Sequence, residues 1–201
     1  MSESEIFNLI NNWLETAKET EKKVNPNNRT PVFGILASIN NDKPSARTIA
    51  INKMFEDNSL LFFTQKSSTK VKQLTINNNV SLVIYLPHHN RQIIFEGIVE
   101  ELDDERTNYY CENYPKTAQI NFLAYGPTSG QIIQSNDHLN ELVASYTKQY
   151  ANTKPAKPDS YIGYIIKPSL IKTYNYNTNL ISDSIIYKKS ASGWEKFRVT
   201  P

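Results

Sequence analysis

The chain has one cysteine, few glycines and no long hydrophobic run, and each shortage excludes a class of protein. Cys111 is the only cysteine among 201 residues, so the chain has no partner for an internal disulfide. The six glycines form neither G-x-G-x-x-G nor G-x-x-x-x-G-K-[ST], which excludes both common glycine-rich phosphate loops. No segment approaches the roughly 18 apolar residues of a membrane-spanning helix, which excludes a membrane-embedded protein.

An excess of charge of one sign is also missing. The 22 basic and 20 acidic side chains give a net charge of +2, which argues against a partner such as nucleic acid or an anionic membrane, bound through a broad electrostatic field. Any anion site must therefore be local. The first residues, MSESEIFNLINN, are acidic where a signal peptide carries lysines. We expect a soluble, cytoplasmic protein.

The residues that carry metal or covalent chemistry are scarce and badly spaced for it. His88, His89, His138 and Cys111 do not have the spacing of a zinc motif, and the first two are expected on the surface of the 87–90 turn. The sequence contains no G-x-S-x-G element. We therefore expect neither a metal site nor a nucleophilic catalytic residue.

The first segment is predicted to be an amphipathic helix from Ser2 to about Lys22, because its apolar residues recur at helical spacing. Trp13 lies beside that stripe. The stripe consists of Phe7, Ile10, Leu14 and Ala17.

Short β-rich runs follow, separated by polar turns. The first three are joined by hairpin-like connections at 40–44 and 56–59, and this close spacing favours an antiparallel meander that closes into a barrel or sandwich. The predicted strands are 31–39, 45–51, 60–64, 80–86 and 92–101.

Three further helices and a second group of strands complete the prediction. A short helix begins at Ser67 or Ser68 and ends near Asn77, with Val71 and Leu74 on its buried side. The other predicted helices are 103–114 and 137–150, followed by a loop at 152–159 and strands at 161–167, 171–176, 185–188 and 194–199. The residues after the loop are too few for an independent core, so we expect one domain over 1–201 with an N-terminal helix.

Cationic and amide side chains cluster at the ends of the early strands. On a meander these ends can converge, and a helix amino terminus with Lys70 in its first turn is a natural seat for phosphate. The competing interpretation is that Lys53, Lys70 and Arg91 are solvated charges. The side chains concerned are Arg47, Lys53, Thr64, Lys70, Arg91 and Gln92.

Six segments, in order along the chain, resemble the pyridoxamine 5′-phosphate oxidase family of FMN flavoproteins, including its phenazine-biosynthesis oxidase branch. They are NWLETAKETE (12–21), KPSARTIAINK (43–53), LLFFTQKSSTK (60–70), RQIIFEGIVEEL (91–102), YYCENYPKTAQI (109–120) and YKKSASGWEKFRVTP (187–201). The resemblance implies a mainly β protein with flanking helices, an FMN-binding split β-barrel. It also implies a homodimer with FMN in grooves at the dimer interface.

The family's R-x-V-x-x-K strand is similar to the segment from Arg47 to Lys53, which has one residue too many. Either Asn52 takes the place of the family lysine or a bulge keeps Lys53 there. We favour Lys53, because its distance in sequence to Thr64 fits the family's next motif.

The family's other motifs have counterparts in this chain that contain substitutions. The family's F-Y-T-N is similar to FFTQ (62–65), its S-R-K to STK (68–70) and its R-Q-V to RQI (91–93). Tyr174 stands where the family has a tryptophan beside the flavin. The resemblance thus assigns ten residues to FMN: Arg47, Thr48, Ile49, Lys53, Phe63, Thr64, Thr69, Lys70, Gln92 and Tyr174.

The substrate side departs further from the family. Where the family holds the substrate phosphate with Lys, Tyr, Arg and Ser, this chain has Lys53, Tyr110, Tyr114 and Ala118, and the family's R-L-H-D-R segment reads LISDS from Leu180. The substrate-binding residues expected from this alignment are Lys53, Tyr110, Tyr114, Leu180 and Ser182. They favour a flat, less charged substrate, although packing is the competing interpretation for each tyrosine.

These observations predict an FMN-dependent oxidase with an altered pocket, which oxidises a small heteroaromatic or amine-like substrate with dioxygen as acceptor. The flavin then carries the redox chemistry and no catalytic side chain is required. One alternative is a non-catalytic flavin- or pyridoxal-phosphate-binding protein. A lower-ranked alternative is a true pyridoxamine/pyridoxine 5′-phosphate oxidase of vitamin B6 salvage.

Overall fold

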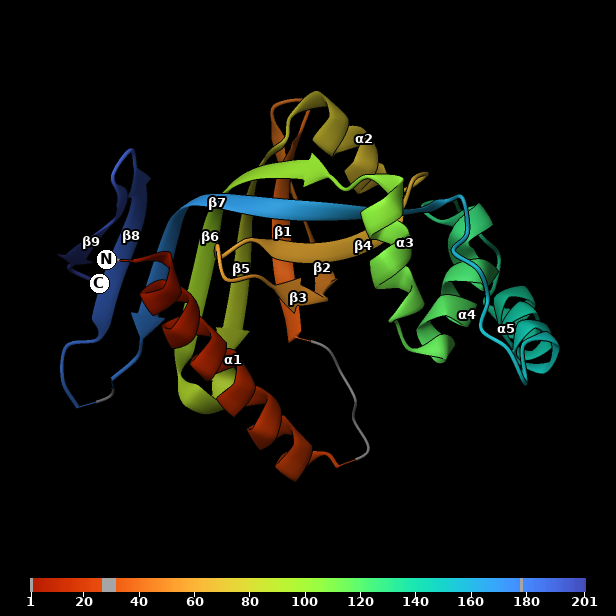
Figure 1. Cartoon of the computed structure of the whole chain (residues 1–201), viewed down its shortest axis with the longest axis horizontal. Helices are drawn as coiled ribbons and strands as arrows, with labels where there is room; N and C mark the ends of the chain where they lie inside the picture. Colours follow the sequence, from red (N-terminus) through yellow and green to blue (C-terminus); the bar gives the residue numbers. More distant parts are fainter. Residues whose placement is uncertain (1, 27–31, 178) are drawn as a thin grey trace. The chain divides into compact units, whose positions relative to one another are not determined.

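The computed structural model describes residues 2–26, 32–177 and 179–201, and Figure 1 shows the arrangement of their helices and strands. The helices are α1 (Glu3–Val24), α2 (Thr69–Ile76), α3 (Asp104–Glu112), α4 (Lys116–Tyr125) and α5 (Asp137–Gln149), with short 3₁₀ turns η1 (Pro87–His89) and η2 (Gly126–Thr128). The strands are β1 (Val32–Asn40), β2 (Lys43–Ile51), β3 (Lys53–Met54), β4 (Leu60–Gln65), β5 (Asn79–Leu86), β6 (Arg91–Glu101), β7 (Tyr161–Asn175), β8 (Asp183–Ser190) and β9 (Gly193–Val199). Residue 31, the first of the predicted strand 31–39, lies outside the described residues.

The chain forms two compact units, each built from separate segments. Unit 1 contains Met1–Phe62, Asn77–Glu100 and Ile165–Pro201, and unit 2 contains Phe63–Ile76 and Glu101–Tyr164. One domain over the whole chain stays a prediction.

The strands form one antiparallel sheet whose order differs from a simple meander. The order is β2-β1-β5-β6-β7-β4-β3; β8 pairs with β7, and β9 pairs with β8. The predicted connection at 40–44 is a hairpin, and Asn41 and Asp42 adopt the left-handed conformation, with φ of 45° and 64°, that such a tight turn requires. The connection at 56–59 is also a hairpin, but it pairs β4 with β3 rather than with β2. Consecutive strands also pair in β5–β6, β7–β8 and β8–β9, so among the described strands the predicted meander fails only where β1 pairs with β5 and β4 with β7.

Helix α1 belongs to unit 1 and begins as its sequence dictates. The Ser2 side chain accepts from the Glu5 amide and the Glu5 carboxylate accepts from the Ser2 amide, which makes a capping box. The fully buried residues are Ile6, Ile10 and Leu14. The predicted stripe was thus displaced by one residue at its start, because Ile6 rather than Phe7 faces the interior.

Two boundaries and one buried face differ from the prediction. The runs 161–167 and 171–176 form the single strand β7, which passes through Lys167 and Pro168 without interruption. The third helix ends at Glu112 rather than near Tyr114. In α2, Gln73 and Leu74 are buried whereas Val71 is only half-buried.

Helix α4 was missed by sequence analysis because its apolar residues do not follow one stripe. It begins directly after Pro115, and Gln119, Ile120 and Ala124 are buried. The Gln119 side-chain amide donates to the carbonyl oxygens of Cys111 (2.6 Å) and Tyr114 (3.0 Å). A polar side chain therefore holds the end of α3 to α4 within unit 2.

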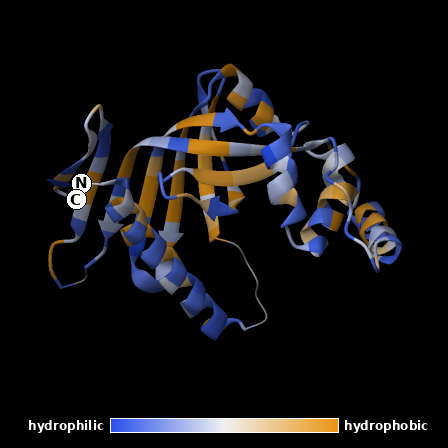
Figure 2. Cartoon of the chain, in the orientation of Figure 1, coloured by the Kyte–Doolittle hydropathy of each residue, from blue (hydrophilic) through white to orange (hydrophobic). Residues whose placement is uncertain are grey.

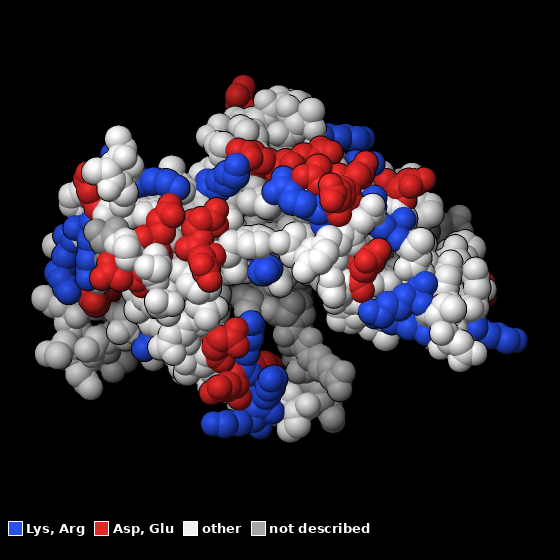
Figure 3. All heavy atoms as spheres, in the orientation of Figure 1, with Lys and Arg blue, Asp and Glu red and all other residues white. Residues whose placement is uncertain are grey.

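The distribution of hydrophobic and charged side chains is consistent with these helices and strands. In Figure 2 the strands carry most of the hydrophobic residues, and on the face drawn in Figure 3 lysines and arginines lie among acidic side chains. No described helix is long and apolar enough to cross a membrane.

Candidate functional site

Arg47 is held on β2 of unit 1 by three hydrogen bonds. It pairs with Leu36 across the β1–β2 hairpin. Its Nη1 donates to the Leu36 carbonyl oxygen (3.2 Å) and to Ser38 Oγ (2.7 Å), and its Nη2 donates to Ser45 Oγ (2.9 Å). Burial lowers the pKa of Arg47, because the charged guanidinium has lost part of its hydration. An anion nearby would compensate for that loss.

The extra residue between Arg47 and Lys53 produces an irregularity in the backbone. Strand β2 ends at Ile51, and the Asn52 amide donates to the Leu61 carbonyl oxygen (2.8 Å), while Lys53 is the register partner of Leu61. Two residues opposite one are typical of a β-bulge. Lys53 is exposed, with its Nζ 4.9 Å from the centre of the Phe55 ring. The bulge is the arrangement expected if Lys53, not Asn52, is equivalent to the family lysine.

In unit 2, Thr64 and Lys70 meet where β4 ends and α2 begins. The Lys70 Nζ donates to Thr64 Oγ1 at 2.8 Å, and Thr64 Oγ1 lies 3.3 Å from Ser68 Oγ. Thr64 and Ser68 are buried, Lys70 is half-buried and Thr69 is exposed. A lysine and two hydroxyls at the first turn of a helix are suited to binding phosphate.

Thr48 and Gln92 lie on one face of the unit 1 sheet. Thr48 pairs with Ile35, Ile35 pairs with Val83, and Tyr85 pairs with Gln92; side chains on a strand alternate between faces, so all five project to the same side. This face is the outer one, because its residues are exposed or half-buried.

Ile49 and Tyr174 have different surroundings in unit 1. Ile49 is 7% exposed and is part of the core. The half-buried Tyr174 ring lies edge-on to Tyr176, with their centroids 4.5 Å apart. Tyr174 is therefore partly accessible to solvent, whereas the Ile49 side chain is almost entirely buried.

Phe63 and Tyr114, assigned to cofactor and substrate respectively, pack in an aromatic cluster of unit 2. The Phe63 ring stacks on Tyr161 (4.8 Å, 19°), Tyr161 meets Phe122 edge-on (4.4 Å), and Tyr114 meets Phe63 edge-on (5.9 Å). Gly163 makes room, since a Cβ there would lie 2.9 Å from Phe63 Cε1.

Phenol groups in this cluster are kept neutral. The Tyr161 hydroxyl is buried and has no hydrogen-bond partner among the described residues, and burial raises the pKa of Tyr161. Burial also raises the pKa of Tyr125 to about 12. The cluster therefore presents aromatic faces and uncharged hydroxyls where the family has an arginine.

The remaining substrate candidates lie at the surface or near it. Tyr110 is half-buried beside Tyr109, with ring centroids 5.1 Å apart. Leu180 is 75% exposed in the connection between β7 and β8, and the Ser182 Oγ accepts from the Asn177 amide (3.2 Å). None of these side chains supplies a positive charge.

Sequence analysis missed the two serines that hold Arg47. Ser38 and Ser45 are register partners in the β1–β2 hairpin. A two-residue turn at Asn41 and Asp42 fixes that register, so this signal was present in the sequence. Ser68 was quoted within a motif but was not assigned to the site.

Comparison with known proteins identifies the class and then the family. The family model described as pyridoxamine 5′-phosphate oxidase matches residues 20–162. A pyridoxine/pyridoxamine 5′-phosphate oxidase of Leptospira interrogans is 32% identical over 191 residues, covering 94% of this chain and 85% of the relative. One of Leptospira biflexa is 28% identical, covering 96% and 87%. The class is thus that of flavin-binding oxidoreductases. The chain belongs to the pyridoxamine 5′-phosphate oxidase family.

Solved structures show the same fold. PhzG of Burkholderia lata, in complex with tetrahydrophenazine-1-carboxylic acid, aligns with a TM-score of 0.77 at 21% identity and covers 98% of this chain and 93% of its own. A pyridoxamine 5′-phosphate oxidase-related, FMN-binding protein of Nostoc punctiforme aligns with a TM-score of 0.69 at 16% identity, covering 92% and 96%. The predicted fold class, mainly β with flanking helices in the pyridoxamine 5′-phosphate oxidase-like fold, is confirmed.

Proposed function

We propose that the protein is an FMN-dependent oxidase. The observation that carries this proposal is the 2.8 Å contact of Lys70 Nζ with Thr64 Oγ1 at the start of α2, in a chain of this family. Both residues are among those that match the family's cofactor motifs. The single domain over 1–201 and the cytoplasmic location belong to the same proposal.

The donor set fits the FMN phosphate. In unit 2, Lys70 supplies a cation and Thr64 and Thr69 supply hydroxyls. In unit 1, Arg47 and Lys53 supply the cations that the family resemblance assigns to the cofactor. Each charge-assisted hydrogen bond to a phosphate contributes about 1.5–3 kcal/mol, so two or three of them would favour FMN over a flavin without the phosphate. No other described feature of the chain, such as a glycine-rich loop, is needed for the phosphate.

The ring system requires flat and polar contacts, which other assigned residues supply. Gln92 would bind the polar edge of the isoalloxazine, and Tyr174 would lie against its face. Thr48, Ile49 and Phe63 would contribute neighbouring contacts, through the backbone in the case of the buried Ile49.

We further propose a homodimer with FMN at its interface. The outer face of the unit 1 sheet exposes Phe33, Ile35 and Tyr85 by 47%, 50% and 53%, and a contiguous exposed apolar surface of this kind marks a protein interface. Two residues assigned to the flavin, Thr48 and Gln92, lie on that same face. A second copy covering it would enclose them.

The substrate is proposed to be a small heteroaromatic or amine-like molecule, bound by Lys53, Tyr110, Tyr114, Leu180 and Ser182. Bound FMN would accept a hydride from it, and dioxygen would take the two electrons to become hydrogen peroxide. Tyrosine and leucine cannot replace a planar arginine in binding a phosphate. We therefore expect a substrate without a phosphate group.

Anaerobic mixing of the FMN-loaded protein with a panel of donors tests the proposal. The panel contains pyridoxamine 5′-phosphate, pyridoxamine and tetrahydrophenazine-1-carboxylic acid. Bleaching of the flavin by an unphosphorylated donor, followed by recovery of colour and peroxide formation on admission of air, is the expected result. A protein that binds no FMN would contradict the proposal.

Two other outcomes correspond to the alternatives. A yellow protein that no donor bleaches would indicate a flavin-binding protein without oxidase turnover. Rapid bleaching by pyridoxamine 5′-phosphate alone would indicate the vitamin B6 enzyme. The neutral aromatic surroundings of Tyr114 give no reason to prefer either alternative to an oxidase with an altered substrate pocket.

A further inference from the structure

Helix α1 holds the turn that precedes Gln92 through an arginine stacked on a tryptophan. The Arg91 guanidinium carbon lies 4.5 Å from the centre of the Trp13 ring, within the range of a cation–π interaction. The buried Arg91 Nε has no hydrogen-bond partner among the residues that the structure describes. The Trp13 face therefore gives this guanidinium a contact that can orient it.

Two more contacts fix the same turn within unit 1. The His89 Nε2 and Thr20 Oγ1 lie 3.0 Å apart, which joins η1 to the second half of α1. Asn90 adopts the left-handed conformation, with φ of 52°, and its carbonyl oxygen accepts from the Tyr176 amide (2.8 Å). Helix α1 and the end of β7 thus hold the 87–91 segment from two sides.

The alternation of β6 carries this constraint to Gln92. Arg91 shares a face with the buried residues Ile93 and Phe95, whereas Gln92 projects to the outer face beside Tyr85. Because adjacent residues of a strand share one rigid backbone, fixing the Arg91 side chain on the inner face fixes where the Gln92 side chain leaves the sheet.

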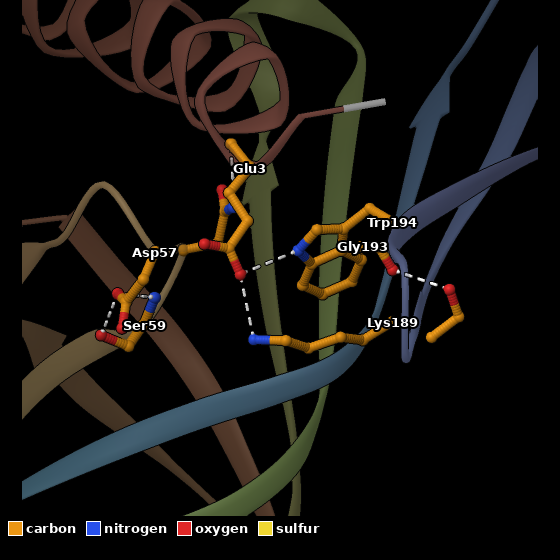
Figure 4. A network of polar contacts seen from close by, with 8 residues as sticks. Glu3, Asp57, Ser59, Lys189, Gly193 and Trp194 are labelled. Atoms are coloured by element: carbon orange, nitrogen blue, oxygen red, sulfur yellow. Dashed lines mark hydrogen bonds and ion pairs between the residues drawn. The ribbon is translucent and has the colours of Figure 1, made fainter.

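The start of α1 is anchored as well, so the helix is a firm support for this contact. Figure 4 shows the Glu3 carboxylate between Trp194 and Lys189, to which it is joined at 3.4 Å and 3.0 Å. The Glu3 carbonyl oxygen also accepts from Asn58 Nδ2 (3.1 Å). Trp194, on the β8–β9 hairpin, is 2% exposed.

We propose that Trp13 and Arg91 are positioning residues for the flavin, which place Gln92 at the polar edge of the isoalloxazine ring. This rests on the proposed function, because Gln92 has this role only if FMN is bound. It assigns to the N-terminal helix a part in tuning the cofactor, although neither Trp13 nor Arg91 needs to touch the flavin.

The test compares Trp13→Leu with Trp13→Phe in the FMN-loaded protein. Leucine removes the aromatic face and phenylalanine keeps it, so W13L should weaken FMN binding by roughly three- to tenfold and alter the visible flavin spectrum. W13F should resemble the unmodified protein in both. Arg91→Lys, which retains the charge but not the planar stacking group, should change the spectrum in the same direction as W13L.

A double-variant cycle shows whether the effect passes through Gln92. If Trp13 acts by placing Gln92, then W13L should add no further spectral change in a Gln92→Leu background. Phe7→Leu, a half-buried ring on the same helix, is the matched control and should leave the spectrum unchanged.

The outcomes of these measurements either support or refute the positioning role of Trp13 and Arg91. Unchanged spectra and FMN affinities in folded W13L and R91K would overturn the positioning role while leaving the proposed function intact. The positioning role would also be overturned if W13L changed the spectrum as much in the Gln92→Leu background as it does in the unmodified protein. Failure of the unmodified protein to bind FMN would instead refute the proposed function.

Discussion

Arg47 and Lys70, assigned to the cofactor, are held by hydrogen bonds of 2.7–3.2 Å and 2.8 Å, whereas Tyr114, assigned to the substrate, packs against the rings of Phe63 and Phe122. The first group has kept the charged and hydroxyl chemistry that a phosphate requires. The second group keeps Lys53 but has Tyr114 where the resemblance places the family's arginine. The two groups therefore differ in chemistry as well as in surroundings.

The residues assigned to the cofactor are held in place by the fold, whereas some residues assigned to the substrate are not. Hydrogen bonds that Arg47 donates to Ser38 and Ser45 give its side chain a defined direction, and such preorganisation lowers the cost of binding an anion. Leu180, by contrast, is 75% exposed and is constrained little by its surroundings. Substrate choice can change at such positions with little effect on folding or on the cofactor.

Removing a phosphate cation should have the largest effect. Lys70→Met should weaken FMN binding by about 10- to 100-fold, the equivalent of one charge-assisted hydrogen bond, as measured by titration of flavin fluorescence. Lys72→Met, an exposed lysine on the same helix, is the control and should leave the affinity unchanged. Equal effects of the two substitutions would mean that Lys70 acts only through net charge.

Truncating Tyr114 should affect folding rather than the cofactor. Tyr114→Ala should lower the free energy of unfolding by about 1–3 kcal/mol, because a half-buried ring loses its aromatic contacts. Tyr114→Phe should cost less than about 1 kcal/mol. Denaturant unfolding gives these values, and the FMN affinity of both variants should stay near that of the unmodified protein. A large loss of FMN affinity in Y114F would erase the distinction between the two groups.

High pH should destabilise the aromatic cluster. Burial raises the pKa of Tyr161, and of Tyr125 to about 12, so above pH ~10 the unfolded phenols release protons that the folded chain retains. Stability is therefore fully present below pH ~10 and falls as the pH rises above it. Tyr161→Phe should reduce this decline, as measured by thermal unfolding across pH 9–11.5, and it removes a hydroxyl buried without a partner. An unchanged pH profile in Y161F would show that Tyr161 titrates normally.

The smallest effect on folding is expected at Leu180. Leu180→Ala should change the free energy of unfolding by less than about 0.5 kcal/mol, because the side chain is largely in solvent. The same substitution should alter the KM of the oxidised donor in steady-state assays. If Leu180→Ala changed the stability but not the KM, Leu180 would not be a substrate-binding residue.

The first hairpin and the irregularity after β2 could be predicted because their signals are local, whereas the assignment of residues to the cofactor stays a prediction. The Asn41–Asp42 turn defines the register that puts Leu36, Ser38 and Ser45 beside Arg47. The extra residue between Arg47 and Lys53, compared with the family motif, indicated a bulge, and the backbone is irregular at Asn52.

Features that depend on contacts far apart in sequence could not be predicted. The pairing of β1 with β5, which joins Ile35 to Val83, follows from packing, and no turn signal specifies it. Helix α4 lacks a single apolar stripe, so its periodicity was hidden. The stacking of Arg91 on Trp13 joins residues 78 positions apart in sequence, and no sequence motif predicts it.

Parallel titration of the purified protein with FMN and with riboflavin tests the central claim most directly. The two ligands share the isoalloxazine ring and differ in the phosphate that Arg47 and Lys70 are proposed to bind. We expect one FMN per chain, bound at least about 100-fold more tightly than riboflavin, as two or more charge-assisted hydrogen bonds require. Equal affinities for the two flavins, or no binding of either, would contradict the account.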